Sequence, residues 1–105
     1  RILVVAEISL TPIGTSDPSL SFYIAKSIES INDIAGVRHT TTSMGTVLEA
    51  DNIEKIFECA KTMSETIHRL GVKRVGILLK IDSRTDKTQS SQDKLDSVKR
   101  HLKGP

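Results

Sequence analysis

The chain is poor in the residue types that give many small proteins their cross-links or their reactive groups. Its 105 residues include no tryptophan, one tyrosine, two phenylalanines and a single cysteine, Cys59. A single cysteine cannot form an internal disulfide bond, so we expect the protein in the reducing cytoplasm. Because the sequence signals no histidine or asparagine partner for Cys59, we interpret it as a structural thiol and not as a nucleophile.

The chain also lacks a strong excess of one charge and any long apolar run. Fifteen lysines and arginines stand against 13 acidic residues, for a net charge of +2, which gives little reason to expect a nucleic acid partner. No run approaches the roughly 20 apolar residues that cross a bilayer, so we expect no membrane partner. We predict no metal site, because the three histidines lie far apart without other ligands at suitable spacing: His39, His68 and His101.

Four short runs rich in apolar and β-branched residues predict β-strands. Pro12 and Gly14 end the first run. Only Met44 and Gly45 separate the second run from the third, which predicts a hairpin with a tight turn. The predicted strands are residues 2–10, 37–43, 46–50 and 72–82.

Apolar residues three or four positions apart predict an amphipathic helix between the first two strands. It lies in residues 16–36, where Asp17 has the position of an N-cap and Pro18 that of the first helical residue. Gly36 is expected to end the helix.

The same pattern recurs in residues 51–71, where Asp51 and Glu54 resemble a capping box. A third helix is predicted at about residues 88–103. Its apolar seam is narrow, so we expect it to dock on the body of the protein or on a neighbouring subunit. The seam consists of Leu95, Val98 and Leu102.

The order strand, helix, strand, strand, helix, strand predicts one α+β domain over residues 1–105. It is typical of the ferredoxin-like fold, a sandwich with a four-stranded antiparallel sheet, here with an added C-terminal helix. Two helices cover only one face of such a sheet. The other face, which we call the open face, must meet solvent, a ligand or another chain.

Alternation along the strands predicts which side chains lie on the open face. We place Glu49 there, because it would otherwise be an unpaired charge in the core. A face of mixed apolar and charged residues favours packing between subunits or a pocket with a few polar groups. The predicted members are Leu3, Val5, Glu7, Val47, Glu49, Leu78 and Lys80.

The two glutamates of the open face have three interpretations. Glu7 and Glu49 could act as a general acid–base pair, or they could form ion pairs with Lys80 or Arg74 on neighbouring strands. A carboxylate could also accept hydrogen bonds from a heterocyclic ligand.

Alternating charges follow the last strand in residues 80–87, "KIDSRTDK". Lysine and arginine there could clamp an anion or a carboxylate. The alternative is a solvated edge whose charges neutralise one another.

Four motifs in order resemble the thiamine-binding protein family: "AEISLTPIGT", "DPSLSFYIAKSI", "TSMGTVLEAD" and "LGVKRVGILLKIDSRTDK". The resemblance runs from about Val5 to Lys87. It implies small ferredoxin-like proteins that assemble as dimers of dimers. It also implies binding of thiamine, or of its hydroxymethylpyrimidine part, near a subunit interface and without catalysis.

The resemblance also implies which residues bind the ligand. Gly45, Thr46 and Glu49 match the hairpin motif, whereas Ala50 stands where the family often has glycine. A carboxylate such as Glu49 could accept a hydrogen bond from the aminopyrimidine.

Thr15 and Ser19 match the family's loop and helix start, and Lys80 and Asp82 belong to the last motif. Thr46 and Ser9 could supply further hydrogen bonds, and Glu7 and Asp82 could lie near the thiazolium cation. Stacking on the ligand is left to Met44, to Phe22 or to a partner subunit.

An alternative function is a regulatory or assembly module that uses the open face only to form oligomers. A hydrolase of the acylphosphatase kind fits less well, because it would need an asparagine on a strand, whereas Asn32 and Asn52 lie at predicted helix ends. We therefore predict a non-enzymatic protein without a cofactor that binds a small heterocyclic ligand as a homotetramer.

Overall fold

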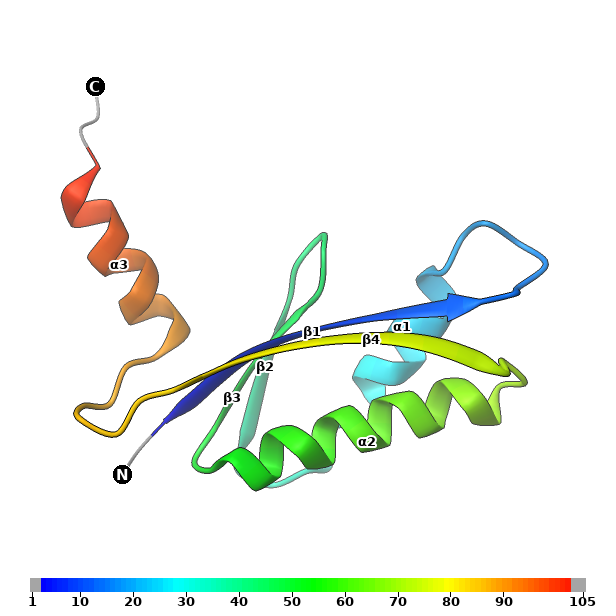
Figure 1. Ribbon diagram of the computed structural model, residues 1–105, viewed down its shortest axis with the longest axis horizontal. Helices are drawn as coiled ribbons and strands as arrows, with labels where there is room; N and C mark the ends of the chain where they lie inside the picture. Colours follow the sequence, from blue (N-terminus) through cyan, green and yellow to red (C-terminus); the bar gives the residue numbers. More distant parts are fainter. Residues whose placement is uncertain (1–2, 103–105) are drawn as a thin grey trace.

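The computed structural model describes residues 3–102 and shows the predicted order of strands and helices. The elements are β1 (Val4–Ile13), α1 (Ser21–Glu29), β2 (Val37–Thr41), β3 (Thr46–Ala50), α2 (Ile53–Arg69), β4 (Arg74–Ser83) and α3 (Ser91–His101). The four strands form one antiparallel sheet in the order β2-β3-β1-β4 (Figure 1). This topology confirms the α+β, ferredoxin-like fold with a C-terminal helix.

One face of the sheet packs against the helices α1 and α2. α2 contacts β1, β3 and β4 as well as α1. As alternation predicts, every second side chain of β1 enters the core between the two layers: Val4, Ala6, Ile8 and Leu10. The most completely buried large side chains come from strands and helices alike and include Ile8, Leu48, Ile56, Met63 and Ile67.

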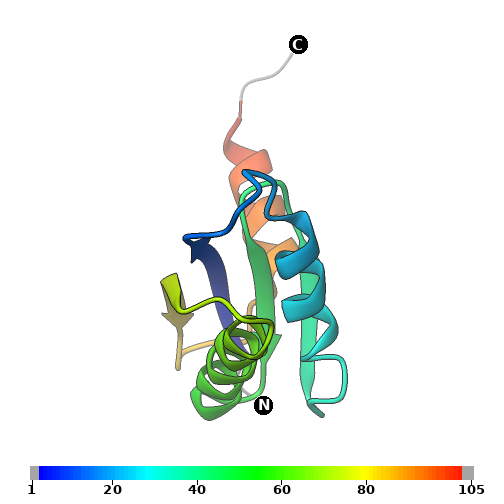
Figure 2. The same cartoon turned by 90° about the vertical axis from the view of Figure 1, so that its right-hand side faces the viewer.

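α3 lies outside this helical layer. It projects from one end of the molecule, away from α1 and α2 (Figure 1 and Figure 2). Its first turn contacts the open face of the sheet through Ser91 and Lys94. No helix within residues 3–102 combines the length and the apolar character needed to span a membrane.

The first helix begins later and ends earlier than predicted. Asp17 is not its N-cap: the carboxylate instead accepts a hydrogen bond from the Ser19 N–H at 2.8 Å, and the helix begins at Ser21. This local turn satisfies the Asp17 side chain and competes with helix formation. After Glu29 the chain continues in short turns, and Ile31 still reaches the core.

Two further boundaries differ from the sequence pattern. β1 continues through Pro12 to Ile13, paired only with β4, because its pairing with β3 ends at Ile8. Proline is tolerated where one side of a strand has no neighbour. α2 is capped by Asn52, whose side chain accepts from the Lys55 N–H at 3.0 Å, so the predicted Asp51 capping box is wrong.

Candidate ligand-binding site

The hairpin between β2 and β3 is organised by the hydroxyl group of Thr42. This hydroxyl donates to the Gly45 carbonyl at 2.9 Å and accepts from the Gly45 N–H at 3.0 Å. Ser43 and Met44 form the tip, so the turn is centred one residue earlier than predicted. A side chain on Gly45 would place its Cβ 2.9 Å from the Ile8 carbonyl oxygen. Glycine therefore allows the hairpin to approach β1 closely.

The unequal lengths of β1 and β3 leave a cavity of about 380 Å³ at the sheet edge. We call this cavity the notch. It lies between β1, the hairpin and α1, and the side chains lining it carry no ionisable group. Its wall consists of residues 8–11, Leu20, Ile24, Ser27 and residues 42–46.

The strand register predicts that backbone groups of β1 point into the notch. Thr42 donates its N–H to the Gly45 carbonyl at 2.9 Å, so the polar groups of Gly45 face β2. Since these groups alternate along a strand, those of Thr46 and of its partner Ile8 face each other. The N–H and C=O of Leu10, two residues further along β1, point to the same side of the strand as those of Ile8. β3 has already ended at this point, so the Leu10 groups face the notch.

The open face carries Glu49, which is only 8% exposed although it lies on the predicted outer side of the sheet. Its carboxylate accepts hydrogen bonds from the Ser91 N–H at 3.3 Å and the Ser91 hydroxyl at 3.1 Å. The Arg38 guanidinium donates to it from 3.4 Å. The placement of Glu49 on the open face is thus confirmed, and its partners are Arg38 and α3.

An ion pair also holds α3 on the open face. Lys94 contacts the carboxylate of Asp82, and this hydrogen-bonded lysine lowers the pKa of Asp82. Between α3 and the sheet lies a cavity of about 480 Å³, which we call the groove. Its lining includes the apolar residues Val5, Val47 and Leu95 and the charged residues Glu7 and Lys80.

A sequence model described as thiamine-binding protein matches residues 6–99. The chain belongs to the thiamine-binding protein family. A UPF0045 protein of Methanothermobacter thermautotrophicus is 36% identical over 100 residues, which are 95% of this chain and 100% of that protein. A UPF0045 protein of Bacillus subtilis is 30% identical over 95% of this chain and 98% of its own length.

Solved structures show the same fold. A hypothetical protein from Methanocaldococcus jannaschii has a TM-score of 0.83 and 35% identity, covering 94% of this chain and 98% of that one. A Thermotoga maritima protein, whose description proposes a role in thiamine biosynthesis or salvage, has a TM-score of 0.73 over 91% of this chain and 98% of that one. The TM-score establishes a common fold, and at 21% identity the likeness shows the fold alone.

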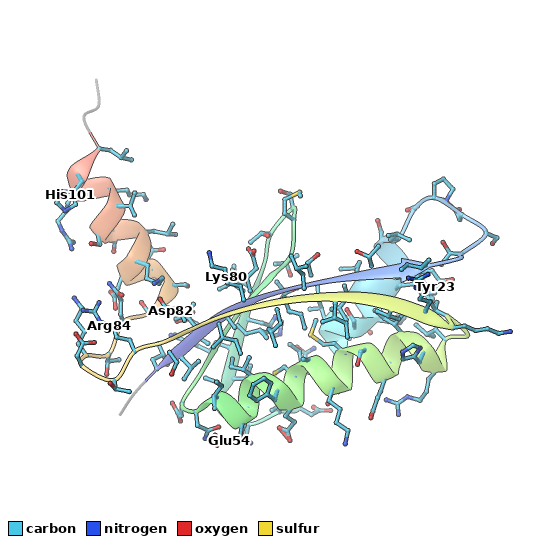
Figure 3. All side chains as sticks on the ribbon, in the orientation of Figure 1. Tyr23, Glu54, Lys80, Asp82, Arg84 and His101 are labelled. Carbon is cyan, nitrogen blue, oxygen red and sulfur yellow. The ribbon has the colours of Figure 1, made fainter. Side chains whose placement is uncertain are left out.

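In this member of the thiamine-binding protein family, the predicted ligand-binding residues of the sheet and hairpin are divided between the two faces of the sheet. Met44, Gly45 and Thr46 line the notch. Thr46 and Glu49 are three residues apart in one strand, so their side chains point to opposite faces. On the open face, Glu7, Lys80 and Asp82 line the groove, and Glu49 lies beside it, bonded to Ser91. Figure 3 shows Lys80 and Asp82 on the side of the sheet from which α3 rises.

Two predicted residues lie in neither cavity. The Thr15 hydroxyl donates to the Asp17 carbonyl at 2.8 Å, and the Ser19 N–H donates to the Asp17 carboxylate. Both therefore stabilise the loop before α1. The structure also places Leu10 and Ser27 in the lining of the notch and Ser91 in that of the groove. The sequence has no signal for these positions, because they depend on strand ends and on contacts distant in the chain.

The charged segment after β4 is largely self-neutralising. The Arg84 guanidinium binds both carboxylate oxygens of Asp86, one of them at 2.8 Å. This bidentate hydrogen bonding lowers the pKa of Asp86. Because Arg84 is occupied within the loop, the geometry favours the solvated edge over an anion clamp.

Proposed function

We propose that the notch binds the aminopyrimidine part of thiamine, or free hydroxymethylpyrimidine, without catalysing a reaction. The observation that carries the proposal is the backbone of Leu10, whose N–H and C=O point by register into a notch formed by the hairpin motif of the family. Membership of the thiamine-binding protein family supports this ligand class.

The hydrogen-bonding groups of an aminopyrimidine are complementary to the backbone groups of one residue in an extended strand. The heterocycle presents a ring nitrogen, which accepts a hydrogen bond, next to an amino group, which donates one. An extended residue presents an N–H donor and a C=O acceptor on the same edge. Leu10 can therefore pair with both groups, while Leu20 and Ile24 give the ring an apolar wall.

Met44 gives the notch an adaptable cover. Its side chain lies at the hairpin tip and is largely exposed. A flexible thioether can pack on a flat ring, which compensates for the lack of strand aromatics.

The lining of the notch favours binding over catalysis. Its polar side chains are serines and threonines, and none of its side chains is a histidine, carboxylate or lysine. General acid–base catalysis uses such groups within hydrogen-bond reach of the reacting atoms. A binding protein is therefore the better description.

The proposal includes a homotetramer built as a dimer of dimers. The support is the open face, where Leu78 is 77% exposed and where the groove has an apolar floor. A second copy of the chain would remove this apolar surface from water.

Titration calorimetry with hydroxymethylpyrimidine and thiamine tests the ligand. Ile24→Phe fills the notch and should weaken binding at least tenfold, because the ring loses its space. Ala25→Phe is the matched control, since it adds a phenyl group to the exposed side of the same helix and should leave the affinity unchanged.

Two results would contradict the notch. Weaker binding in Glu49→Gln together with unchanged binding in Ile24→Phe would place the ligand on the open face. An absence of heat with either ligand at millimolar concentration would favour the alternative of an assembly module without this ligand.

A further inference from the structure

The open face is organised in rows of residues that pair across all four strands. Residues paired in neighbouring strands present their side chains on the same face of the sheet, and residues two apart in one strand do so as well. Two adjacent rows therefore lie side by side on the open face. From β2 to β4, the first row is Arg38, Glu49, Val5 and Asp82, and the second is Thr40, Val47, Glu7 and Lys80.

The charges of the first row all have partners. Glu49 is bonded to Arg38 and to Ser91, and Asp82 is bonded to Lys94. These contacts hold the start of α3 against the sheet, and they leave no charge of the first row available to a ligand.

The charges of the second row have no such partners. Glu7 and Lys80 are directly opposite each other in β1 and β4, but within residues 3–102 neither side chain forms an ion pair. Both line the groove. The groove therefore contains a carboxylate and an ammonium group, side by side, that the described part of the chain leaves unpaired.

We propose that the groove is a second ligand-binding site, which takes a small zwitterion, namely an α-amino acid with an apolar side chain. Of the described residues, only Thr42 lines both the groove and the notch. The inference is therefore independent of the pyrimidine ligand that we propose for the notch.

The positions of Glu7 and Lys80 match the two charged groups of an α-amino acid. Cα atoms of residues paired across antiparallel strands lie about 4.5–5.5 Å apart, so the two side chains start from neighbouring points on the floor of the groove. The ammonium and carboxylate groups of an α-amino acid are attached to one carbon atom. Glu7 can therefore accept a hydrogen bond from the ammonium group while Lys80 donates to the carboxylate, and both bonds are charge-assisted.

The balance of charge in the groove favours a zwitterion over a simple anion or cation. The ionisable side chains that line it are two carboxylates and two lysines: Glu7, Asp82, Lys80 and Lys94. An anion would pair with Lys80 and leave Glu7 unpaired beside it, and a cation would do the reverse. A ligand that carries both charges satisfies the whole row.

The rest of the groove suits the apolar side chain of such a ligand. Its volume of about 480 Å³ is within the usual range of small-molecule sites, roughly 300–1,000 Å³. Val5 and Val47 form an apolar floor, and Leu95 lines the groove from α3 while remaining 55% exposed. A ligand side chain placed between them would remove this apolar surface from water. Leu78, which supports the proposed assembly, does not line the groove, so the two uses of the open face involve different residues.

Titration calorimetry with L-phenylalanine and two analogues tests the site. Phenethylamine lacks the carboxylate and 3-phenylpropionate lacks the ammonium group, but both keep the apolar ring. L-phenylalanine should bind at least ten times more tightly than either analogue, because each analogue loses one charge-assisted hydrogen bond.

Two substitutions separate the roles of the charged residues. Lys80→Gln should lower the affinity for L-phenylalanine at least tenfold and leave unchanged the affinity for phenethylamine, which has no carboxylate. Glu7→Gln should also weaken L-phenylalanine at least tenfold, with 3-phenylpropionate as the unaffected ligand. The sheet should fold in both variants, since both side chains are exposed. Glu54→Gln is the matched control, because it neutralises a carboxylate on α2, across the sheet from Lys80 (Figure 3), and should change none of these affinities.

The outcomes separate this inference from the proposed function. If hydroxymethylpyrimidine binds but L-phenylalanine gives no heat at millimolar concentration, the groove site is wrong and the notch stands. If binding of L-phenylalanine is lost in Ile24→Phe and retained in Glu7→Gln, the amino acid occupies the notch, which also overturns the groove site. If L-phenylalanine alone binds, with the dependence on Glu7 and Lys80 given above, the groove site is supported and the pyrimidine ligand of the notch is overturned.

Discussion

The carboxylate of Glu49 accepts two hydrogen bonds from Ser91, a residue 42 positions later in the chain. This contact joins β3 to the start of α3. It also explains how an acidic residue can be buried on the open face, which α1 and α2 do not cover. The notch, where we propose that the ligand binds, and the open face, where we propose assembly, are therefore separate surfaces of the sheet.

Ser91→Ala should loosen α3 without unfolding the sheet. The substitution removes the hydroxyl that donates to Glu49 at 3.1 Å, and a hydrogen bond to a charged group contributes about 1.5–3 kcal/mol. Because the contact holds only α3, the expected result is faster amide hydrogen exchange in residues 91–101, with little change in the exchange of α2.

Ser97→Ala is the control, because it makes the same chemical change on the same helix, at a residue that makes no hydrogen bond to Glu49. Equal protection of α3 in both variants would show that Ser91 does not anchor the helix.

Most of the fold could be predicted from the sequence, because its determinants are local. The alternation of apolar and polar residues in β1, strict from Ala6 to Leu10, specifies both the strand and its buried face. The side of Glu49 also follows from this logic, since an unpaired carboxylate in the core would be costly. Helix starts were less predictable: Asp17 and Asp51 both occupy plausible cap positions, but Asp17 forms a turn with Ser19 and Asn52 caps α2.

The candidate site could be predicted only in part. The hairpin motif identified Met44, Gly45 and Thr46, which do line one cavity. The same motif suggested that Glu49 joins them, although a spacing of three residues in a strand places it on the other face. The backbone of Leu10 could not be found from sequence, because its orientation depends on where β3 ends.

Gly45→Ala should destabilise the protein and distort the notch. The new Cβ would lie 2.9 Å from the Ile8 carbonyl oxygen and 3.4 Å from the Glu7 Cγ. Since the nearest atom belongs to the backbone of β1, the hairpin must move, and overpacking of this kind costs about 1–3 kcal/mol. Urea denaturation measures the loss in the free energy of unfolding.

Gly76→Ala is the matched control for Gly45→Ala. Gly76 also lies in the sheet, but a Cβ there would be 3.8 Å from its nearest neighbours on Thr11, which is ordinary van der Waals contact. We expect its stability to be unchanged or slightly higher. Equal losses in the two variants would mean that the close approach of the hairpin to β1 is not what requires glycine.

The pair of Lys94 and Asp82 should make the attachment of α3 sensitive to acid. The hydrogen bond and charge of Lys94 lower the pKa of Asp82 below its ordinary value. A carboxyl whose folded pKa is lowered contributes stability above its unfolded pKa, about 3.9 for aspartate, and this contribution is lost as the pH falls through the lowered folded value. Protection of the α3 amides should therefore decrease below about pH 4.

NMR titration of the Asp82 carboxyl carbon checks the cause. Lys94→Ala should raise the pKa of Asp82 towards the ordinary value. Lys99→Ala removes a lysine from the far end of α3 and should leave the pKa of Asp82 where it is. A midpoint that is the same in wild type and Lys94→Ala would show that the lysine does not hold this carboxylate in solution, and the acid sensitivity of α3 would then need another group on the open face.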